Sequence, residues 1–233
     1  MNPSTEAALK LLNANSEAAG AGFLFAATDE GIEISYAEHN IRFNHSFVRG
    51  PYARRAGQTN QALLKACNNK QRNINTLLDM TGGWGIDSLS LAVHGQQVTL
   101  LEQNQLVFAI VAYSLGCLAA TRAGSSLASR ITLKRINAYD YLQSADSDAG
   151  FDCIYLDPMF PSHKSTAKPA KALQVLQALT ENRDIDSCFE LALETARKRV
   201  VVKRPARATK LGELKPDLVY REKTIRFDVY LTS

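Results

Sequence analysis

The chain has 233 residues, 45% of them hydrophobic and 21% charged, which excludes a disordered or fibrous protein and favours one well-buried domain with at most a small appendage. No apolar run reaches the roughly 20 residues that span a bilayer, and the opening residues lack the order of a signal peptide, so we expect a cytoplasmic protein without membrane contact. The formal net charge of +4 is modest, so any attraction for a polyanion must come from how the charges are distributed.

Residues 1–73 predict a small α+β appendage. The opening residues favour a helix, and the stretch GFLFAATDEGIEISYAEHNIRFNHS, 22–46, alternates apolar and polar residues around an Asp-Glu-Gly turn, which predicts a hairpin. Apolar residues three and four apart in TNQALLKACNN, 59–69, predict a short helix. No linker composition follows, so we expect this part to pack against residues 74–233.

Residues 74–233 alternate apolar strands with helical stretches. Such alternation requires crossover connections, and crossovers produce a mainly parallel sheet covered on both faces. The last two strands follow each other without a helix, so they should form an antiparallel hairpin at the sheet edge. The prediction is an α/β, Rossmann-like fold with a seven-stranded sheet. The expected strands are 75–80, 97–103, 130–136, 151–157, 198–205, 217–224 and 226–233, and the expected helices 87–95, 105–124, 170–183 and 187–198.

Glycines and an acid follow the first two strands of this second part. In an open parallel sheet, ligands bind outside the carboxyl ends of the strands. In DMTGGWGID, 79–87, Gly83 and Gly85 permit a tight turn and close approach of a ligand, and Asp87 is expected to cap the next helix. Glu102 ends the second strand, where an acid can accept hydrogen bonds from both hydroxyls of a ribose. An ordinary surface acid is the alternative reading of Glu102.

The third strand is followed by NAYDYL, 137–142. Asp140 is placed to accept a hydrogen bond from the amino group of an adenine, and Tyr139 to flank its ring. An acid at the start of a helix is equally explained as a cap, so both readings stay open here.

The stretch YLDPMFP, 155–161, follows the fourth strand and suits the recognition of an exocyclic amine. Asp157 and the carbonyl of Pro158 can each accept a hydrogen bond from the amine, and Phe160 offers a flat surface for the base. The prolines restrict the loop before a substrate arrives. Such an amine is a poor nucleophile that must be held in line with an electrophilic methyl group, but it requires no strong base. Taken alone, Asp-Pro would be an ordinary turn.

Three groups of basic residues contain no acid, a distribution that favours binding to a polyanion over a merely solvated face. Seven basic residues lie between Glu38 and Asp79, seven lie between Glu194 and Glu213, and a smaller group follows YLDPMFP. The candidates for phosphate contacts are Arg54, Arg55, Lys164, Lys203 and Arg204.

Together these features resemble the S-adenosylmethionine-dependent class I methyltransferases that act on exocyclic amines. More narrowly, YLDPMFP, KRVVVKRP, RFDVY and FVRGPYARR are similar to the ribosomal RNA small subunit methyltransferase J family, over roughly residues 42–233. The resemblance implies methyl transfer from S-adenosylmethionine to the N2 amine of a guanosine in 16S ribosomal RNA. The implied partner is that RNA or the small ribosomal subunit, with no obligate protein partner.

The resemblance also implies roles for individual residues and leaves RNA recognition less defined than catalysis. The family often has a longer glycine-rich segment where this chain has AGQTNQ, and a longer N-terminal region. By resemblance, Ile86 and Asp87 would border the cofactor, and Glu102 with Gln103 would contact its ribose. Tyr139 and Asp140 would contact its adenine, and Asp157 would lie between the cofactor and the target amine.

Other classes of protein stay open. A nicotinamide-dependent oxidoreductase would share the glycine turn and Glu102, but its G-x-G-x-x-G spacing would put a glycine close to Asp87. A non-enzymatic RNA-binding protein would leave the acids at three strand ends unexplained. Methylation of adenine N6, in RNA or DNA, is the nearest alternative, because the same loop can hold either amine. The four cysteines and four histidines are scattered, so we expect reduced thiols and no metal site.

Overall fold

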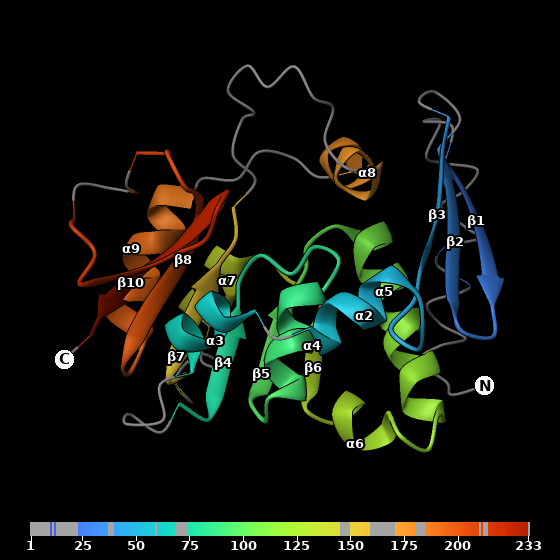
Figure 1. The fold of residues 1–233 in the computed structure, drawn as a ribbon, viewed down its shortest axis with the longest axis horizontal. Helices are drawn as coiled ribbons and strands as arrows, with labels where there is room; N and C mark the ends of the chain where they lie inside the picture. The colour runs from blue at the N-terminus through green and yellow to red at the C-terminus, as the bar shows by residue number, and fades with distance from the viewer. Residues whose placement is uncertain are drawn as a thin grey trace.

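Two sheets organise the protein in the computed structural model (Figure 1). The structure describes residues 10, 12, 23–36, 40–58, 60–68, 74–144, 150–158, 171–179, 185–209, 211 and 214–232. The helix expected in the opening residues therefore lies outside the described residues, apart from Lys10 and Leu12. Within the described part, no helix is long and apolar enough to cross a bilayer.

The predicted N-terminal hairpin is confirmed, and a third strand extends it into a meander. The strands β1 (Phe23–Thr28), β2 (Gly31–Tyr36) and β3 (Ile41–His45) pair in antiparallel order. Thr28 stabilises the first turn, because its hydroxyl oxygen accepts a hydrogen bond from the Gly31 N–H at 3.1 Å.

Two short helices follow the meander where the sequence predicted one. The first, α2 (Pro51–Gly57), begins with a proline, whose missing N–H costs nothing at this position. The second, α3 (Gln61–Cys67), is the predicted helix, and the Asn60 side chain caps it by accepting a hydrogen bond from the Leu63 N–H at 2.8 Å. The prediction missed α2 because only two buried residues mark its apolar side.

The larger sheet has the predicted seven strands, in the order β6-β5-β4-β7-β8-β10-β9. The strands from β6 to β8 pair in parallel, whereas β10 is antiparallel to both β8 and β9. The closing hairpin is therefore confirmed as the edge of a mainly parallel sheet. Its strands are β4 (Thr76–Asp79), β5 (Gln97–Leu101), β6 (Ile131–Lys134), β7 (Cys153–Leu156), β8 (Arg199–Pro205), β9 (Leu218–Arg221) and β10 (Ile225–Leu231).

Helices cover both faces of this sheet (Figure 1). The remaining helices are α4 (Ile86–Val93), α5 (Gln105–Ala120), α6 (Ser125–Ala128), α7 (Ala138–Gln143), α8 (Lys171–Leu179) and α9 (Ile185–Thr195). Leu77 and Tyr155 pack in one cluster with α3 and α4, whereas their neighbours Leu78 and Ile154 pack in another with α7 and α9. Strands that are apolar on both faces are typical of buried parallel sheets.

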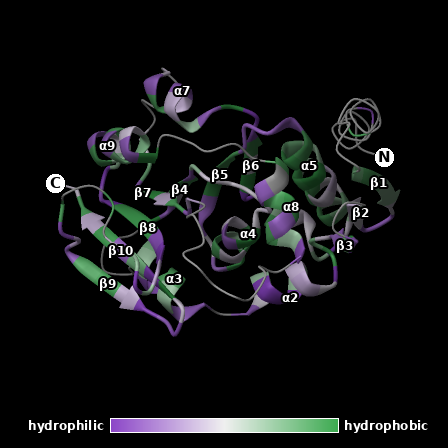
Figure 2. Ribbon diagram, turned by 90° about the horizontal axis from the view of Figure 1, so that it is seen from above, coloured by the Kyte–Doolittle hydropathy of each residue, from purple (hydrophilic) through white to green (hydrophobic). Residues whose placement is uncertain are grey.

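A third hydrophobic cluster joins the meander to the larger sheet through α5, a largely hydrophobic helix beside the meander (Figure 2). His45 is fully buried in this cluster, with Nδ1 2.7 Å from Ser114 Oγ and Nε2 3.0 Å from the Trp84 carbonyl oxygen. Burial lowers the pKa of His45 to about 4, although backbone hydrogen bonds oppose the shift. Because one cluster includes residues on both sides of position 73, the division into parts 1–73 and 74–233 stays a prediction.

The helix α8 lies within the expected helix 170–183 and packs against the N-terminal part of the chain. Its Val175 is buried in the cluster formed by the meander and α5. The Trp84 Nε1–H also donates a hydrogen bond to the Ala172 carbonyl oxygen at 2.9 Å. The amphipathic face of α8 is covered there, and a Cβ added to Gly83 would come within 3.2 Å of Leu176. As a result, α8 lies next to the glycine turn.

Candidate active site

Three positions in the turn between β4 and α4 require glycine. Gly83 and Gly85 have φ angles of +50° and +71°, which side chains rarely tolerate. A Cβ at Gly82 would lie 2.5 Å from the Leu101 carbonyl oxygen at the end of β5. The turn therefore packs directly against the neighbouring strand and presents its backbone at the carboxyl edge of the sheet.

The Glu102 carboxylate lies directly beside this turn and is almost completely buried, with 1% of the residue exposed. Its Oε2 accepts a hydrogen bond from the Gly83 N–H at 3.0 Å, and its Oε1 accepts one from the Asn104 N–H at 2.7 Å. A carboxylate oxygen can accept more than one hydrogen bond. The structure thus brings the predicted ribose acid to the glycine turn, and its contact with a ribose stays a prediction.

The start of α7 lies next to the end of β5. The Asn137 Nδ2–H donates a hydrogen bond to Gln103 Oε1 at 2.7 Å, which connects the two elements. Asn137 also caps α7 by accepting a hydrogen bond from the Tyr139 N–H at 2.8 Å. Asp140 is therefore not the cap, and the capping alternative for this acid was wrong. Tyr139 and Asp140 are exposed in the first turn, where they stay candidates for adenine contacts.

A cluster of charged side chains surrounds the end of β7, and we call Asp87, Asp157, Lys203 and Tyr155 the acidic cluster. Lys203 Nζ lies 2.8 Å from Asp87 Oδ2 and 2.8 Å from Asp157 Oδ2. The Tyr155 hydroxyl donates a hydrogen bond to Asp87 Oδ2 at 2.6 Å. Asp87 was expected to cap α4, but Gly85 occupies the cap position, and the carboxylate of Asp87 instead binds Lys203 and Tyr155.

The two carboxylates of the acidic cluster differ in pKa. Burial raises the pKa of Asp157 above its ordinary value, although the positive charge of Lys203 opposes the rise. Burial also opposes ionisation of Asp87, but Lys203 and the hydrogen bond from Tyr155 outweigh it and lower the pKa of Asp87. Lys203 stays protonated, since its two acidic neighbours raise its pKa despite burial. About 38% of the Asp157 side chain is exposed, so the group is accessible to a ligand.

Another acid, Asp79, lies at the end of β4 and was not among the predicted site residues. Asp79 is buried and accepts hydrogen bonds from Ser88 Oγ at 2.6 Å and from the Thr81 N–H at 3.0 Å. The Thr81 hydroxyl oxygen in turn accepts a hydrogen bond from the Asp157 N–H at 2.6 Å. Burial raises the pKa of Asp79 to about 7. An acid at the end of the strand that precedes a glycine turn was a signal that could have been read.

The five candidates for phosphate contacts have different environments. Arg54 and Arg55 are exposed on α2, and Lys164 lies outside the described residues, as does Phe160. Lys203 is engaged with two carboxylates inside the acidic cluster. Arg204 is only 5% exposed, and its guanidinium donates to the Thr209 carbonyl oxygen, so a phosphate contact does not fit its burial.

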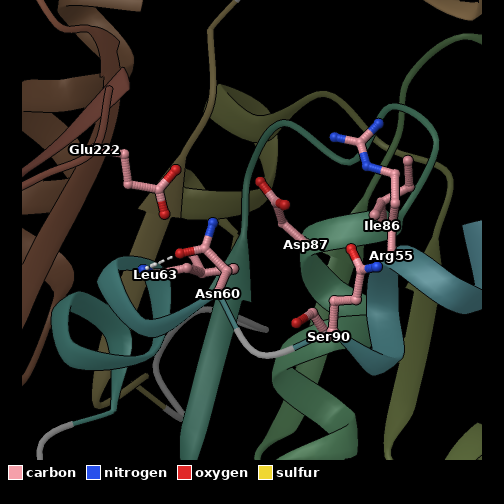
Figure 3. A pocket seen from close by; sticks show the side chains of 8 residues that line it. Arg55, Asn60, Leu63, Ile86, Asp87, Ser90 and Glu222 are labelled. Carbon is pink, nitrogen blue, oxygen red and sulfur yellow. Dashed lines mark hydrogen bonds between the residues drawn. The ribbon is translucent and has the colours of Figure 1, made fainter. Parts of the chain in front are cut away.

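Ile86 and Asp87 line a cleft of about 200 Å³ together with residues of α2, α3 and the turn between β9 and β10 (Figure 3). Pro158 is half-buried directly after Asp157. No three His, Cys, Asp or Glu side chains in the described ranges come together as a metal site would require.

Comparisons with known proteins agree with this geometry. The family model described as "Putative SAM-dependent methyltransferase" matches residues 8–232. Two relatives are named ribosomal RNA small subunit methyltransferase J. The one from Nitrosococcus oceani is 34% identical and aligns over 86% of this chain and 81% of its own length, and the one from Actinobacillus pleuropneumoniae is 38% identical over 88% and 84%.

A solved structure has the same fold over nearly its whole length. It is a SAM-dependent methyltransferase from Neisseria gonorrhoeae, 28% identical, with a TM-score of 0.74 over 99% of this chain and 93% of that chain. The fold is therefore that of the class I methyltransferases, and S-adenosylmethionine is the cofactor. The chain belongs to the ribosomal RNA small subunit methyltransferase J family.

Proposed function

We propose that this protein transfers a methyl group from S-adenosylmethionine to the exocyclic N2 amine of a guanosine in 16S ribosomal RNA of the small ribosomal subunit. The name of the two relatives supports ribosomal RNA as the substrate. The observation that carries the proposal is the position of Asp157, whose backbone is bound to Thr81 of the glycine turn and whose carboxylate is bound to Lys203. An acceptor fixed in this way suits an amine that must be oriented.

The residues around the glycine turn fit the cofactor. Gly83 and Gly85 have positive φ angles and pack closely against neighbouring side chains, which fixes the path of the turn backbone beside Glu102. Glu102 would accept hydrogen bonds from the ribose hydroxyls beside Gln103, and Tyr139 with Asp140 would contact the adenine. When bound, S-adenosylmethionine supplies an electrophilic methyl group on a positively charged sulfur.

The second task of the site is to orient the amine. A guanine amine shares its lone pair with the ring, so it reacts only when it is held in line with the methyl group. The Asp157 carboxylate and the Pro158 carbonyl would each accept one N–H of the amine, and Lys203 would hold the Asp157 side chain in place. No nucleophilic side chain is required, because the methylated amine loses its proton readily. Phe160 stays a candidate surface for the base.

Two alternatives from the sequence now have different weights. Membership of a SAM-dependent family overturns the nicotinamide-dependent reading. Methylation of adenine N6 stays the second candidate, because the Asp157 and Pro158 acceptors would fit either amine. Exposed Arg54 and Arg55 stay the candidates for phosphate contacts.

Methyl transfer to 16S ribosomal RNA from a strain lacking this protein tests the proposal. Labelled product, digested to nucleosides and analysed by mass spectrometry, should contain N2-methylguanosine, and the Asp157→Ala variant should yield none while it binds S-adenosylmethionine with at most moderately lower affinity. N6-methyladenosine as the product would favour the second candidate. No labelled RNA, with either naked RNA or small subunits, would overturn the proposed substrate.

A further inference from the structure

The cleft beside α4 lies next to the acidic cluster, and it shares Ile86 and Asp87 with the residues expected to border the cofactor. Figure 3 shows Glu222, from the turn between β9 and β10, on one side of the cleft, and Ser90 and Ile86 of α4 on the other. Asn60 lies between them at the start of α3. The volume of about 200 Å³ is below the roughly 300–1,000 Å³ of clefts that enclose whole drug-sized ligands, so the cleft suits a single small ring system.

A buried hydroxyl without a partner points to a ligand in this cleft. Ser90 is only 3% exposed, and its Oγ has no hydrogen-bond partner among the described residues. Buried polar groups are nearly always paired, so an orphaned hydroxyl on the wall of a cleft requires an explanation. Ser88, two positions earlier in α4, shows the ordinary case, because its Oγ donates to Asp79.

The remaining walls define the chemistry of the ligand. Leu63 and Ile86 are apolar and suit the faces of a planar ring. The Asn60 side-chain oxygen already accepts the Leu63 N–H, which leaves its amide nitrogen as a donor. The Glu222 carboxylate is exposed at the mouth and can only accept hydrogen bonds when ionised. A nucleobase has these properties, because its faces are apolar and its edge carries both N–H donors and acceptors.

We propose that this cleft binds one base of the substrate RNA adjacent to the target guanosine, and that Glu222 and Ser90 read its edge. The inference rests on the proposed function and adds a site for sequence recognition. Asp87 lines the cleft, and Lys203 Nζ lies 2.8 Å from both Asp87 and Asp157, so the cleft is next to the proposed amine site. Single-stranded RNA is read in this manner, through bases that are splayed out and bound at their Watson–Crick edges.

Charged residues around the cleft give the RNA strand a continuous path. Arg55, on α2, lies at one side of the cleft. On the other side of Glu222 is a second cleft of about 220 Å³, which Lys65, Tyr220 and Arg221 line. Lys65 and Arg221 supply cations of the kind that single-strand binding sites use for phosphates, whereas Tyr220 is partly buried against the hydrophobic cluster that includes α3 and β10. A strand that passes the first cleft would therefore continue toward β9.

Glu222→Gln gives a sharp test because charge and base reading predict opposite results. Removal of a negative charge should tighten non-specific RNA binding, whereas loss of an ionised acceptor should weaken specific binding. We expect a rise of roughly tenfold in Kd for 16S ribosomal RNA from a strain lacking this protein, measured by filter binding with non-specific competitor RNA. Glu194→Gln, which makes the same charge change on α9, is the matched control and should leave Kd unchanged or lower it.

Ser90→Ala provides the second test. Removal of an unpaired buried hydroxyl should leave the melting temperature unchanged or raise it, yet it should raise Kd for the RNA roughly threefold to tenfold. S-adenosylmethionine affinity should stay at the wild-type value in both variants. RNA binding equal to the wild type in both variants would overturn the inference, even if the wild type methylates guanosine. Weaker RNA binding by both variants would support the cleft even if the methylated base were adenosine, which would overturn only the proposed amine.

Discussion

Replacement of Lys203 by methionine removes the ammonium group between Asp87 and Asp157. Its Nζ lies 2.8 Å from a carboxylate oxygen of each, and only 21% of the Lys203 side chain is exposed. Breaking a fully buried ion pair costs roughly 3–5 kcal/mol, because it leaves an uncompensated charge. Since 38% of the Asp157 side chain is exposed and water screens that charge, we expect a smaller loss of about 2 kcal/mol in the free energy of unfolding.

The same substitution should change how methyl transfer depends on pH. Burial raises the pKa of Asp157, and Lys203 opposes that rise. Without the ammonium group the pKa of Asp157 rises further, so fewer molecules carry an ionised Asp157 at any given pH. We therefore expect the acidic limb of the kcat profile to move to higher pH, which single-turnover methyl transfer at saturating cofactor would measure.

Two variants separate this effect from a general loss of stability. Lys203→Arg keeps a cation and should keep the acidic limb close to that of the wild type. Lys198→Met removes the ion pair between Lys198 Nζ and Asp152 Oδ1, which are 2.8 Å apart at the opposite end of the same strands, so it should lower stability without moving the limb. If Lys203→Met shows the wild-type acidic limb, Lys203 does not act on the ionisation of Asp157.

Three further predictions concern charge. Asp79 has a pKa of about 7 in the folded protein against 3.8 in the unfolded chain, so the free energy of unfolding should fall by up to about 4 kcal/mol as pH rises from about 4 to about 7. Thermal melts of Asp79→Asn should lack this loss, and the same dependence of stability on pH in the wild type and the variant would contradict the prediction. His45 has a pKa of about 4 in the folded protein against 6.5 in the unfolded chain, so the free energy of unfolding should fall by up to about 3 kcal/mol as pH drops from about 6.5 to about 4. If a His45→Gln variant loses the same stability in acid, His45 is not the source of the loss. Charge reversal of Arg54 and Arg55 to glutamate should weaken RNA binding. The slope of log Kd against log salt concentration should become shallower by about one for each RNA phosphate that the protein no longer neutralises. An equal loss of cofactor affinity would indicate misfolding instead.

The succession of strands along residues 74–233 could be predicted because each local signal agreed with the fold. Apolar runs such as 151–157 are long enough for one buried strand and too short for a core helix, and each crossover between such runs favours a parallel neighbour. The glycine turn and Glu102 were predictable for the same reason, since strand ends in a parallel sheet meet at one edge. The position of α8 was not, because its amphipathic face matches more than one apolar surface.

The acidic cluster could not be assembled from the sequence, because its parts meet only through the order of the strands. Asp87 and Lys203 are 116 positions apart, and they come together because β4, β7 and β8 are adjacent in the sheet. The burial of Arg204, which does not fit the predicted phosphate contact, could have been expected from the sequence. Successive residues of a strand point to opposite faces, so Lys203 and Arg204 could not both face one phosphate. When a basic pair falls inside an apolar strand of a covered sheet, at least one of its members must be buried, and its partner should be sought among the acids at neighbouring strand ends.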